Sequence, residues 1–240
     1  MASFGIVGMG KMGQAITALL EGPQKASFHT FNRLTTHNEH LLKDSEIVIE
    51  FTTPDAAPDI ITHCINDGIP IVSGTTGWHE YHLETIKNLC KQKQGKFMYA
   101  SNFSIGMNIT FAVNRKLAMI MNEFPQFKPS MLEKHHIHKK DSPSGTAYSL
   151  LEDIFENNPR YTGFDLNSKS PDDSKIPVTA IREGEIKGYH EVRWNSGLEQ
   201  ILLSHEAYDR KIFAEGAILA ATWLKKQKPG IYTMRDLIGV

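Results

Sequence analysis

The segment from Glu133 to Ala147 holds the densest set of side chains that could move protons. Three histidines and three lysines lie within seven positions, from Lys134 to Lys140, in a chain whose formal net charge is only -1. Crowded cations disfavour one another's charged forms, so some of these groups can give and take protons near neutral pH. The same crowding attracts an anionic substrate. Proton transfer to a bound anion is the chemistry that this segment predicts.

A helix is predicted to begin just after this basic run, at Ser144-Gly145-Thr146. The first N–H groups of a helix have no partner inside the helix, so Gly145 and Thr146 could hold a carboxylate. The simplest alternative is a solvated basic loop followed by a capped helix. A metal site on His136, His138 and Asp141 is a further alternative, but Lys139 and Lys140 stand between the second histidine and the aspartate and would repel a cation. We therefore expect no metal.

A second candidate site lies at the amino end of the chain, in the run FGIVGMGKMGQAI. Gly8, Gly10 and Gly13 have G-x-G-x-x-G spacing between an apolar strand and a helix, which is the context that a dinucleotide-binding turn requires. Gly8 permits the tight turn, Gly10 lets the backbone approach a pyrophosphate, and Gly13 allows close packing of the helix on the strand. A purely structural glycine turn is the alternative.

Asn32 and Arg33 stand where a site for NAD would usually place an acid that holds the ribose 2′-hydroxyl. Asn32 can still bond a ribose hydroxyl, and Arg33 can pair with a 2′-phosphate. We expect NADPH to be accepted at least as well as NADH, unless Arg33 is an ordinary solvated residue.

The elements that position the glycine loop alternate between strands and helices, which predicts a doubly wound, Rossmann-like α/β domain with a parallel sheet. Strands are expected at Ser3–Val7, Phe28–Asn32, Glu46–Phe51, Ile69–Ser73 and Phe97–Ser101, and helices at about Lys11–Glu21, Ala56–Asp67 and Glu80–Gln92. Ligands bind at the carboxyl ends of such strands. Gly74-Thr75-Thr76 and the segment 100–103 are therefore expected to wall the cofactor pocket.

The rest of the chain predicts an α+β domain for substrate binding and oligomerisation. Helices are expected at Asn108–Phe124, from about Thr146, and at Phe213–Lys226, with strands at Ser130–His136, Val178–Ile181, His190–Trp194 and Gln200–Ala207. The alternation within these strands suggests an open mixed sheet, largely antiparallel, with one wet face that could bind another subunit. We expect residues 1–103 with 214–240 to form the dinucleotide domain and 104–213 the second. The prolines of FPQFKP suggest a crossing between the lobes.

Composition excludes several classes of protein. With 26 basic and 27 acidic residues, the chain has no overall attraction to nucleic acid or to anionic membranes. Its two cysteines are too few for a disulfide framework, and no apolar run approaches a membrane span. A cytoplasmic protein is expected.

The run E-K-H-H-I-H-K-K-D-S-P-S-G-T-A resembles the signature E-x-H-H-x-x-K-x-D-x-P-S-G-T-A of the 4-hydroxy-tetrahydrodipicolinate reductase family, also called dihydrodipicolinate reductases. Agreement extends along nearly the whole chain, from Lys11-Met12 in the glycine loop and the strand end Glu50-Phe51-Thr52 to the tail 234–237. The resemblance implies an NAD(P)H-dependent reductase of a small dicarboxylate in the diaminopimelate route to lysine, with a homotetrameric assembly.

The resemblance also implies roles for individual residues. His135 and Lys139 match the catalytic acid/base and the proton donor, while His136, Gly145 and Thr146 match substrate-binding residues. The expected cofactor-binding residues are Gly8, Met9, Gly10, Lys11, Met12, Gly13, Asn32, Arg33, Gly74, Thr75, Thr76, Ala100, Ser101, Asn102 and Phe103.

Two departures from the family pattern are present: many members have a longer glycine loop and an acid where Asn32 stands. The second puts a preference for NADH in doubt. Another two-domain NAD(P)-dependent oxidoreductase would share the glycine loop but would have no reason for the H-H-x-x-K and S-G-T-A pairing. A dinucleotide-sensing regulator would be expected to carry a basic recognition helix, which we do not find in the sequence.

Overall fold

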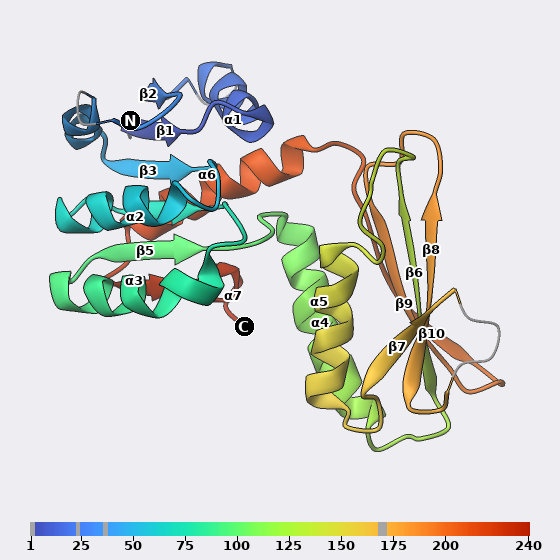
Figure 1. The fold of residues 1–240 in the computed structure, drawn as a ribbon. Coiled ribbons are helices and arrows are strands. Elements are labelled where there is room, and N and C mark those ends of the chain that lie inside the picture. Colours follow the sequence, from blue (N-terminus) through green and yellow to red (C-terminus); the bar gives the residue numbers. More distant parts are fainter. Residues whose placement is uncertain (1–2, 23–24, 36–37, 168–171) are drawn as a thin grey trace. The chain divides into compact units, whose positions relative to one another are not determined.

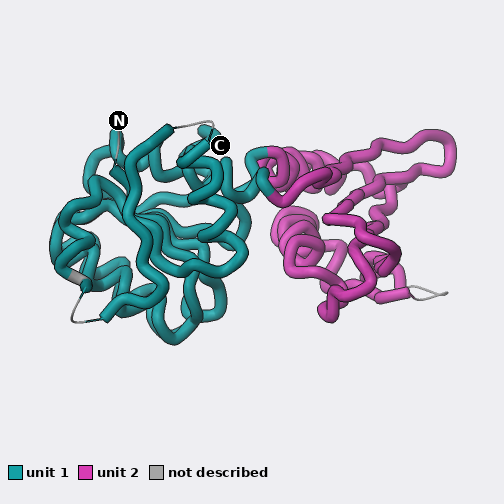
Figure 2. Tube along the Cα trace, turned by 90° about the horizontal axis from the view of Figure 1, so that it is seen from above, with its two compact units in different colours: residues 1–105, 211–240 teal, residues 106–210 magenta. Residues whose placement is uncertain are grey.

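The computed structural model describes residues 3–22, 25–35, 38–167 and 172–240. The chain divides into two compact units (Figure 2). Unit 1 comprises residues 1–105 and 211–240, and unit 2 comprises residues 106–210. Each unit has its own sheet and its own apolar core.

Unit 1 is built on a six-stranded sheet in the order β11-β5-β4-β3-β1-β2, with every neighbouring pair parallel (Figure 1). Its strands are β1 (Ser3–Val7), β2 (Ser27–Phe31), β3 (Ile47–Glu50), β4 (Ile71–Ser73), β5 (Lys96–Tyr99) and β11 (Gly230–Tyr232). The chain leaves β1 toward β2 on one side, whereas β3 lies on the other side. The strand order therefore reverses at β1 and β3, and ligands of such sheets bind at the carboxyl ends of the strands there.

Helices cover both faces of this sheet. On one face lie α1 (Lys11–Glu21), α6 (Lys211–Lys225) and α7 (Met234–Ile238), whose apolar residues share a core with β1 and β3. On the other face lie α2 (Ala57–Asn66) and α3 (His79–Lys93), together with the 3-10 helix η1 (Glu39–Asp44). Because both faces are covered, β3 is buried along its whole length.

The predicted parallel, Rossmann-like sheet is confirmed, and all five expected strands form within a few residues of their expected ends. The short strand β11 and helix α7, near the carboxyl end, were not predicted. Only three residues make up β11, so its sequence carries too short an apolar pattern to be found.

Unit 2 has a five-stranded sheet in the order β10-β9-β6-β8-β7. Its strands are β6 (Lys128–His135), β7 (Gly163–Leu166), β8 (Lys175–Arg182), β9 (Tyr189–Asn195) and β10 (Gln200–Glu206). Residues of α4 (Ile105–Met121) and α5 (Gly145–Asn157) share a core with this sheet. The expected mixed sheet is confirmed, but its expected largely antiparallel character is wrong. The pairs β10–β9 and β9–β6 are antiparallel, whereas β6–β8 and β8–β7 are parallel.

The prediction that FPQFKP crosses between the lobes is also wrong. Residues 124–129 lie inside unit 2, where they connect α4 to β6. The chain passes between the units at residues 105–106 and 210–211 instead. Prolines mark the end of α4 correctly, but a helix break does not by itself distinguish a turn within a domain from a crossing between domains.

None of the helices in the described ranges combines the length and the apolar character that a membrane span requires.

Candidate active site

The candidate active site of unit 2 is organised by Glu133, whose side chain is fully buried. Along strand β6 buried side chains alternate with side chains that are exposed or partly buried, so Glu133 and His135 lie on the same buried face. A buried carboxylate is costly unless hydrogen bonds or cations compensate it. The partners of Glu133 therefore define the site.

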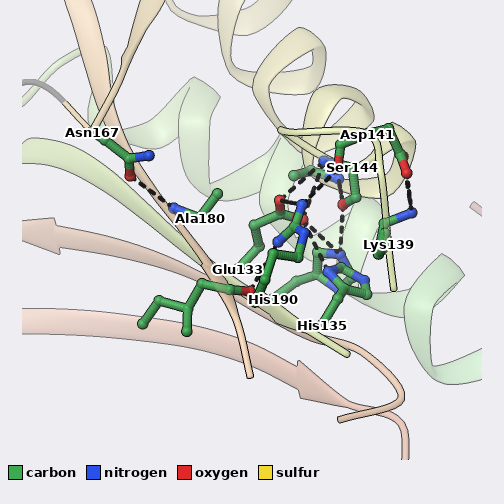
Figure 3. A network of polar contacts seen from close by, with 11 residues as sticks. Glu133, His135, Lys139, Asp141, Ser144, Asn167, Ala180 and His190 are labelled. Atoms are coloured by element: carbon green, nitrogen blue, oxygen red, sulfur yellow. Dashed lines mark hydrogen bonds and ion pairs between the residues drawn. The ribbon is translucent and has the colours of Figure 1, made fainter. Parts of the chain in front are cut away.

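Those partners come from β6 itself and from two other elements (Figure 3). Arg182, at the end of β8, donates from Nη2 to Oε1 of Glu133 at 2.7 Å. The backbone N–H of Ser144, just before α5, points at both carboxylate oxygens, at 3.1 and 3.2 Å. Nδ1 of His135 lies 3.2 Å from Oε2. A single carboxylate thus connects β6, β8 and the start of α5.

His190, on the neighbouring strand β9, completes this buried cluster. The Oγ atom of Ser144 accepts a hydrogen bond from the N–H of Ala147 and lies 3.1 Å from Nε2 of His190. Because the Ser144 hydroxyl can still donate its proton or accept a second hydrogen bond, this contact suits either tautomer of a neutral imidazole. The rings of His135 and His190 lie edge to face, with centroids 5.0 Å apart.

Burial and neighbouring charges leave both Glu133 and His190 deprotonated at neutral pH. Burial alone raises the pKa of Glu133, but contacts with His135, Ser144 and Arg182 outweigh it and lower the pKa to about 2. Burial, followed by repulsion from His135, lowers the pKa of His190 to about 3. At neutral pH the cluster therefore contains an ionised carboxylate and a neutral histidine.

Lys139 and His136 lie in the loop after β6. Nζ of Lys139 donates to both carboxylate oxygens of Asp141, at 2.8 Å each. Arg210 lies 3.0 Å from Nε2 of His136, and since a guanidinium can only donate, this nitrogen is an acceptor. Desolvation, with Arg210 next, lowers the pKa of His136. Two cationic side chains and a neutral imidazole thus line this loop.

The start of α5 offers a place for an anion beside this loop. Ser144 caps the helix through its side chain, and Gly145 and Thr146 occupy the first helical positions. A Cβ placed on Gly145 would meet nothing within 4 Å, so there is space beside its Cα, and the backbone N–H of Gly145 helps to lower the pKa of the Asp141 carboxyl group. Together with the helix dipole, this geometry favours a carboxylate.

A cation fits this cluster poorly. Within the part of the chain that the structure describes, ligand atoms of Glu133, His135 and His190 lie within 4.8 Å of one another. Arg182 already occupies one oxygen of Glu133, and it would repel a metal ion. Asp141, which the sequence had made a possible ligand, is paired with Lys139.

In unit 1 the three glycines have the geometry expected of a dinucleotide-binding turn. Gly8 has a φ of +95°, and a Cβ there would lie 2.0 Å from the carbonyl oxygen of Phe51. A Cβ on Gly13 would lie 2.0 Å from the oxygen of Gly8, whereas one on Gly10 would meet nothing. Gly8 and Gly13 are therefore required for packing, and Gly10 leaves the amino end of α1 open to a phosphate. These residues fit a dinucleotide.

The other residues expected in this loop divide by environment. Met9 and Met12 pack against the core of unit 1, whereas Lys11 is exposed. The two methionine side chains therefore contribute to the core, whereas the lysine side chain stays accessible from outside.

Asn32 and Arg33, just after β2, line a cavity of about 710 Å³. Its other walls come from the segment after β3 and from α2, including Thr52, Asp59 and Ile60. The cavity contains both a guanidinium and apolar surface, as a binding site for a phosphorylated nucleoside requires. Asn32 and Arg33 therefore lie where one end of a cofactor bound at the glycine turn would be expected.

The remaining expected cofactor residues follow two adjacent strands. Gly74, Thr75 and Thr76 come directly after β4, and residues 100–103 come directly after β5. The side chain of Phe103 is buried and meets the ring of Phe51 edge to face, with centroids 5.7 Å apart. Phe103 can therefore present only its backbone to a ligand.

Sequence reasoning gave no role to several side chains that organise the sites: Glu50, Glu133, Arg182, His190 and Arg210. Glu133 could have been found, because it is two residues before His135 on a strand and must face the same way. Arg182 and His190 could not, since strand pairing brings them to β6 from far along the chain.

Comparison with known proteins assigns the chain to a family. Residues 2–103 match the model of "Dihydrodipicolinate reductase, N-terminus" and residues 106–238 match that of "Dihydrodipicolinate reductase, C-terminus". The chain belongs to the dihydrodipicolinate reductase family. The 4-hydroxy-tetrahydrodipicolinate reductase of Christiangramia forsetii is 39% identical, over 97% of this chain and 96% of the relative, and that of Pelagibacter ubique is 36% identical, over 96% and 95%.

Solved structures agree on the fold of this reductase. The dipicolinate-bound dihydrodipicolinate reductase of Paenisporosarcina sp. TG-14 superposes with a TM-score of 0.81 at 20% identity, covering 99% of both chains. A meso-diaminopimelate dehydrogenase variant from Clostridium tetani reaches a TM-score of 0.57 at 12% identity, over 98% of this chain and 94% of the other. The reductase therefore shares its two-part architecture with dehydrogenases of different substrates.

Proposed function

We propose that this chain reduces 4-hydroxy-tetrahydrodipicolinate to tetrahydrodipicolinate with NADH or NADPH, in the diaminopimelate route of lysine biosynthesis. The observation that carries this proposal is the buried Glu133, which holds His135 beside the start of α5 in a strongly basic part of the chain. A regulator that only bound a dinucleotide would have no use for this cluster.

The substrate is a dianion, and unit 2 offers complementary groups. Gly145 and Thr146 would hold one carboxylate at the start of α5. Arg210 and His136, which contact each other at 3.0 Å, would meet the substrate's other polar groups. A guanidinium suits a carboxylate because its donors match both oxygens.

The cofactor would be held by the glycine loop 8–13, with its adenosine end near Asn32 and Arg33 and its nicotinamide end near 74–76 and 100–103. When bound, the nicotinamide supplies the hydride. Gly8 and Gly13 have no room for a side chain, and their close packing fixes the backbone of the turn. Gly10 can therefore approach the pyrophosphate.

Protons are moved by residues of unit 2. The substrate loses its 4-hydroxyl as water, the resulting conjugated ring accepts hydride at C4, and one proton is then taken up. Lys139 is the proposed donor of that proton, because its cationic form also stabilises negative charge on the ring nitrogen and C3. For this step Lys139 must exchange its contact with Asp141 for one with the substrate. His135, whose Nδ1 lies 3.2 Å from the Glu133 carboxylate, assists in proton shuttling.

The experiment that tests this function follows NADPH oxidation by the purified chain. The substrate is the freshly generated product of the preceding pathway enzyme, and an unrelated keto acid serves as control. We expect oxidation only with the pathway intermediate. Oxidation with the keto acid alone would mean that another oxidoreductase activity is the true one.

We also propose that the reductase is a homo-oligomer, of four chains by family resemblance. The face of the unit 2 sheet opposite α4 and α5 carries Leu202 on β10, which is 48% exposed, and the charged pair Glu191–Arg193 on β9. Such a mixed face suits an interface between identical subunits. Light scattering at micromolar concentration tests this, and the mass of a single chain would contradict it.

A further inference from the structure

Glu50 is a buried acid for which the proposed mechanism has no use. It ends β3, and its side chain is fully buried. Four donors surround it: the N–H and Oγ1 of Thr52 at 2.7 and 2.5 Å, Oγ1 of Thr75 at 2.5 Å and Oγ of Ser73 at 2.6 Å. Glu50 therefore binds together the segments that follow β3 and β4.

Every partner of Glu50 among the described residues is neutral, and no ion pair involves it there. A carboxylate has no proton to give, so each of the three hydroxyl groups must donate to it. The hydroxyl oxygens then keep only lone pairs for other partners. Oγ1 of Thr75 already accepts from the N–H of Thr52 at 2.7 Å, whereas no residue in the described ranges donates to Oγ1 of Thr52, which keeps both of its lone pairs.

The position of Thr52 connects this network to the cofactor. Thr52 lines the same cavity as Asn32 and Arg33. Its segment is held from β1 as well, since the N–H of Phe51 donates to the oxygen of Val7 at 2.9 Å. On the other side, Nε1 of the buried Trp78 donates to the oxygen of Thr75 at 2.8 Å. The hydroxyl of Thr52 is thus fixed in both place and direction.

We propose that Glu50 is a positioning residue for the cofactor. It holds the Thr52 hydroxyl as a hydrogen-bond acceptor, and that hydroxyl contacts the cofactor. The donor that this acceptor takes is the 3′-hydroxyl of the adenosine ribose. That group is a donor in both NADH and NADPH, because the extra phosphate of NADPH occupies the 2′ position. The inference rests on the proposed cofactor site and adds to it the means by which the ribose is bound without the usual acid after β2.

Changes at Glu50 and at Arg33 should affect the binding of the two cofactors differently. Replacing the carboxylate by an amide (Glu50→Gln) introduces donors, so the Thr52 hydroxyl can turn and lose its acceptor role. We expect Glu50→Gln to weaken NADH and NADPH equally, by about tenfold in Kd. A residue that reads the 2′-phosphate would weaken NADPH alone.

The experiment is a fluorescence titration of the full chain with each cofactor, for wild type, Glu50→Gln, Thr52→Val and the double variant. Thr52→Val keeps the shape of the side chain and removes the hydroxyl. If Glu50 acts through Thr52, each single change weakens both cofactors and the double variant is no weaker than the worse single one. Kd effects that multiply in the double variant, or a Glu50→Gln protein that binds like wild type, would overturn the inference.

Glu46→Gln is the matched control. Glu46 lies just before β3, at the opposite end of the strand, where it forms an exposed ion pair with Lys225. This change also replaces a glutamate by its amide and should leave both Kd values unchanged. A shift as large as that of Glu50→Gln would show that any charge change on β3 disturbs the site, and would contradict the specific role of Glu50.

Two arms keep the test decisive if Glu50→Gln does not fold. Thr52→Ser retains a hydroxyl and should bind both cofactors like wild type, whereas Thr52→Val should not. Equal binding by these two variants would overturn the inference. Should wild type bind neither cofactor, the proposed function itself fails, which is a different outcome from a wild type that binds and a Thr52→Val variant that binds equally well.

Discussion

Among the residues that the structure describes, two glutamates are fully buried, Glu50 in unit 1 and Glu133 in unit 2, and their surroundings differ. Glu50 receives hydrogen bonds from one backbone N–H and three hydroxyl groups. Glu133 accepts hydrogen bonds from the guanidinium of Arg182 and from the backbone N–H of Ser144, and two histidines lie beside it. Each lies near the carboxyl end of a strand and holds the loop that its site uses.

The difference reflects what each unit must do. Around Glu50 none of the described partners changes its charge at ordinary pH, so the cofactor site keeps one arrangement of donors and acceptors. Around Glu133 the side-chain partners are cationic or titratable, so the acid controls which nitrogen carries a proton and how the basic segment is oriented. Fixed hydrogen bonds suit the binding of a cofactor, whereas titratable groups suit the transfer of a proton.

The largest expected contrast is in stability. Glu133→Gln leaves the partly buried Arg182 without a counter-ion and should lower the free energy of unfolding by roughly 3 kcal/mol. Glu50→Gln leaves no charge behind and should cost about 1–2 kcal/mol. Urea unfolding of both variants measures this, and an equal loss would mean that the charge of the partners does not matter.

The next effect concerns pH. Because the folded state lowers the pKa of His190 from its ordinary value to about 3, unfolded chains bind a proton that folded chains do not. The resulting stability is fully present above the ordinary histidine pKa and is lost as pH falls toward about 3. From about pH 6 to about pH 4, this loss should be on the order of 2 kcal/mol.

His190→Gln isolates that contribution, since the glutamine amide can still hydrogen-bond Ser144 but does not titrate. Its free energy of unfolding should fall less steeply with acid than that of wild type. Parallel pH curves for the two proteins would show that His190 is not the group responsible.

A smaller effect is expected at the cofactor site. Arg33→Ala should weaken NADPH by about tenfold and leave NADH unchanged, because only NADPH carries a 2′-phosphate for the guanidinium. The ratio of the two Kd values is the measurement. An unchanged ratio would mean that Arg33 is an ordinary solvated side chain and that the protein recognises the cofactor through its ribose.

The smallest effect is at the start of α5. Ser144→Ala removes the side-chain cap and the contact with His190, and should cost about 1 kcal/mol of stability. Ser144→Thr keeps the hydroxyl and serves as its control. If both variants were as stable as wild type, the cap would contribute nothing measurable.

The sequence was informative where chemistry and local structure coincide. The glycine loop and the basic segment could be located because spacing along a short stretch determines their geometry, and the strands of unit 1 because apolar runs of this length are distinctive. Residues brought together by pairing of distant strands could not be found. Arg182 and His190 reach Glu133 only because β8 and β9 lie on either side of β6, and no pattern within β8 or β9 reveals that register.

The same reason explains the errors. The antiparallel expectation failed at two pairs, because β8 lies parallel to β6 and the four-residue strand β7 adds at the sheet edge parallel to β8. The segment FPQFKP was assigned to a crossing because its prolines were clear, yet the position of a crossing depends on which core each flanking element joins.

The most direct test of the account is the turnover of Lys139→Ala with NADPH and freshly generated 4-hydroxy-tetrahydrodipicolinate, measured together with the Kd for NADPH. General acid catalysis is worth about 10²–10⁴ in rate, so kcat should fall by that order. The Kd for NADPH should stay at the wild-type value, since Lys139 belongs to unit 2 and the proposed cofactor residues to unit 1. Wild-type turnover in this variant would contradict the proposal that the basic segment delivers the proton.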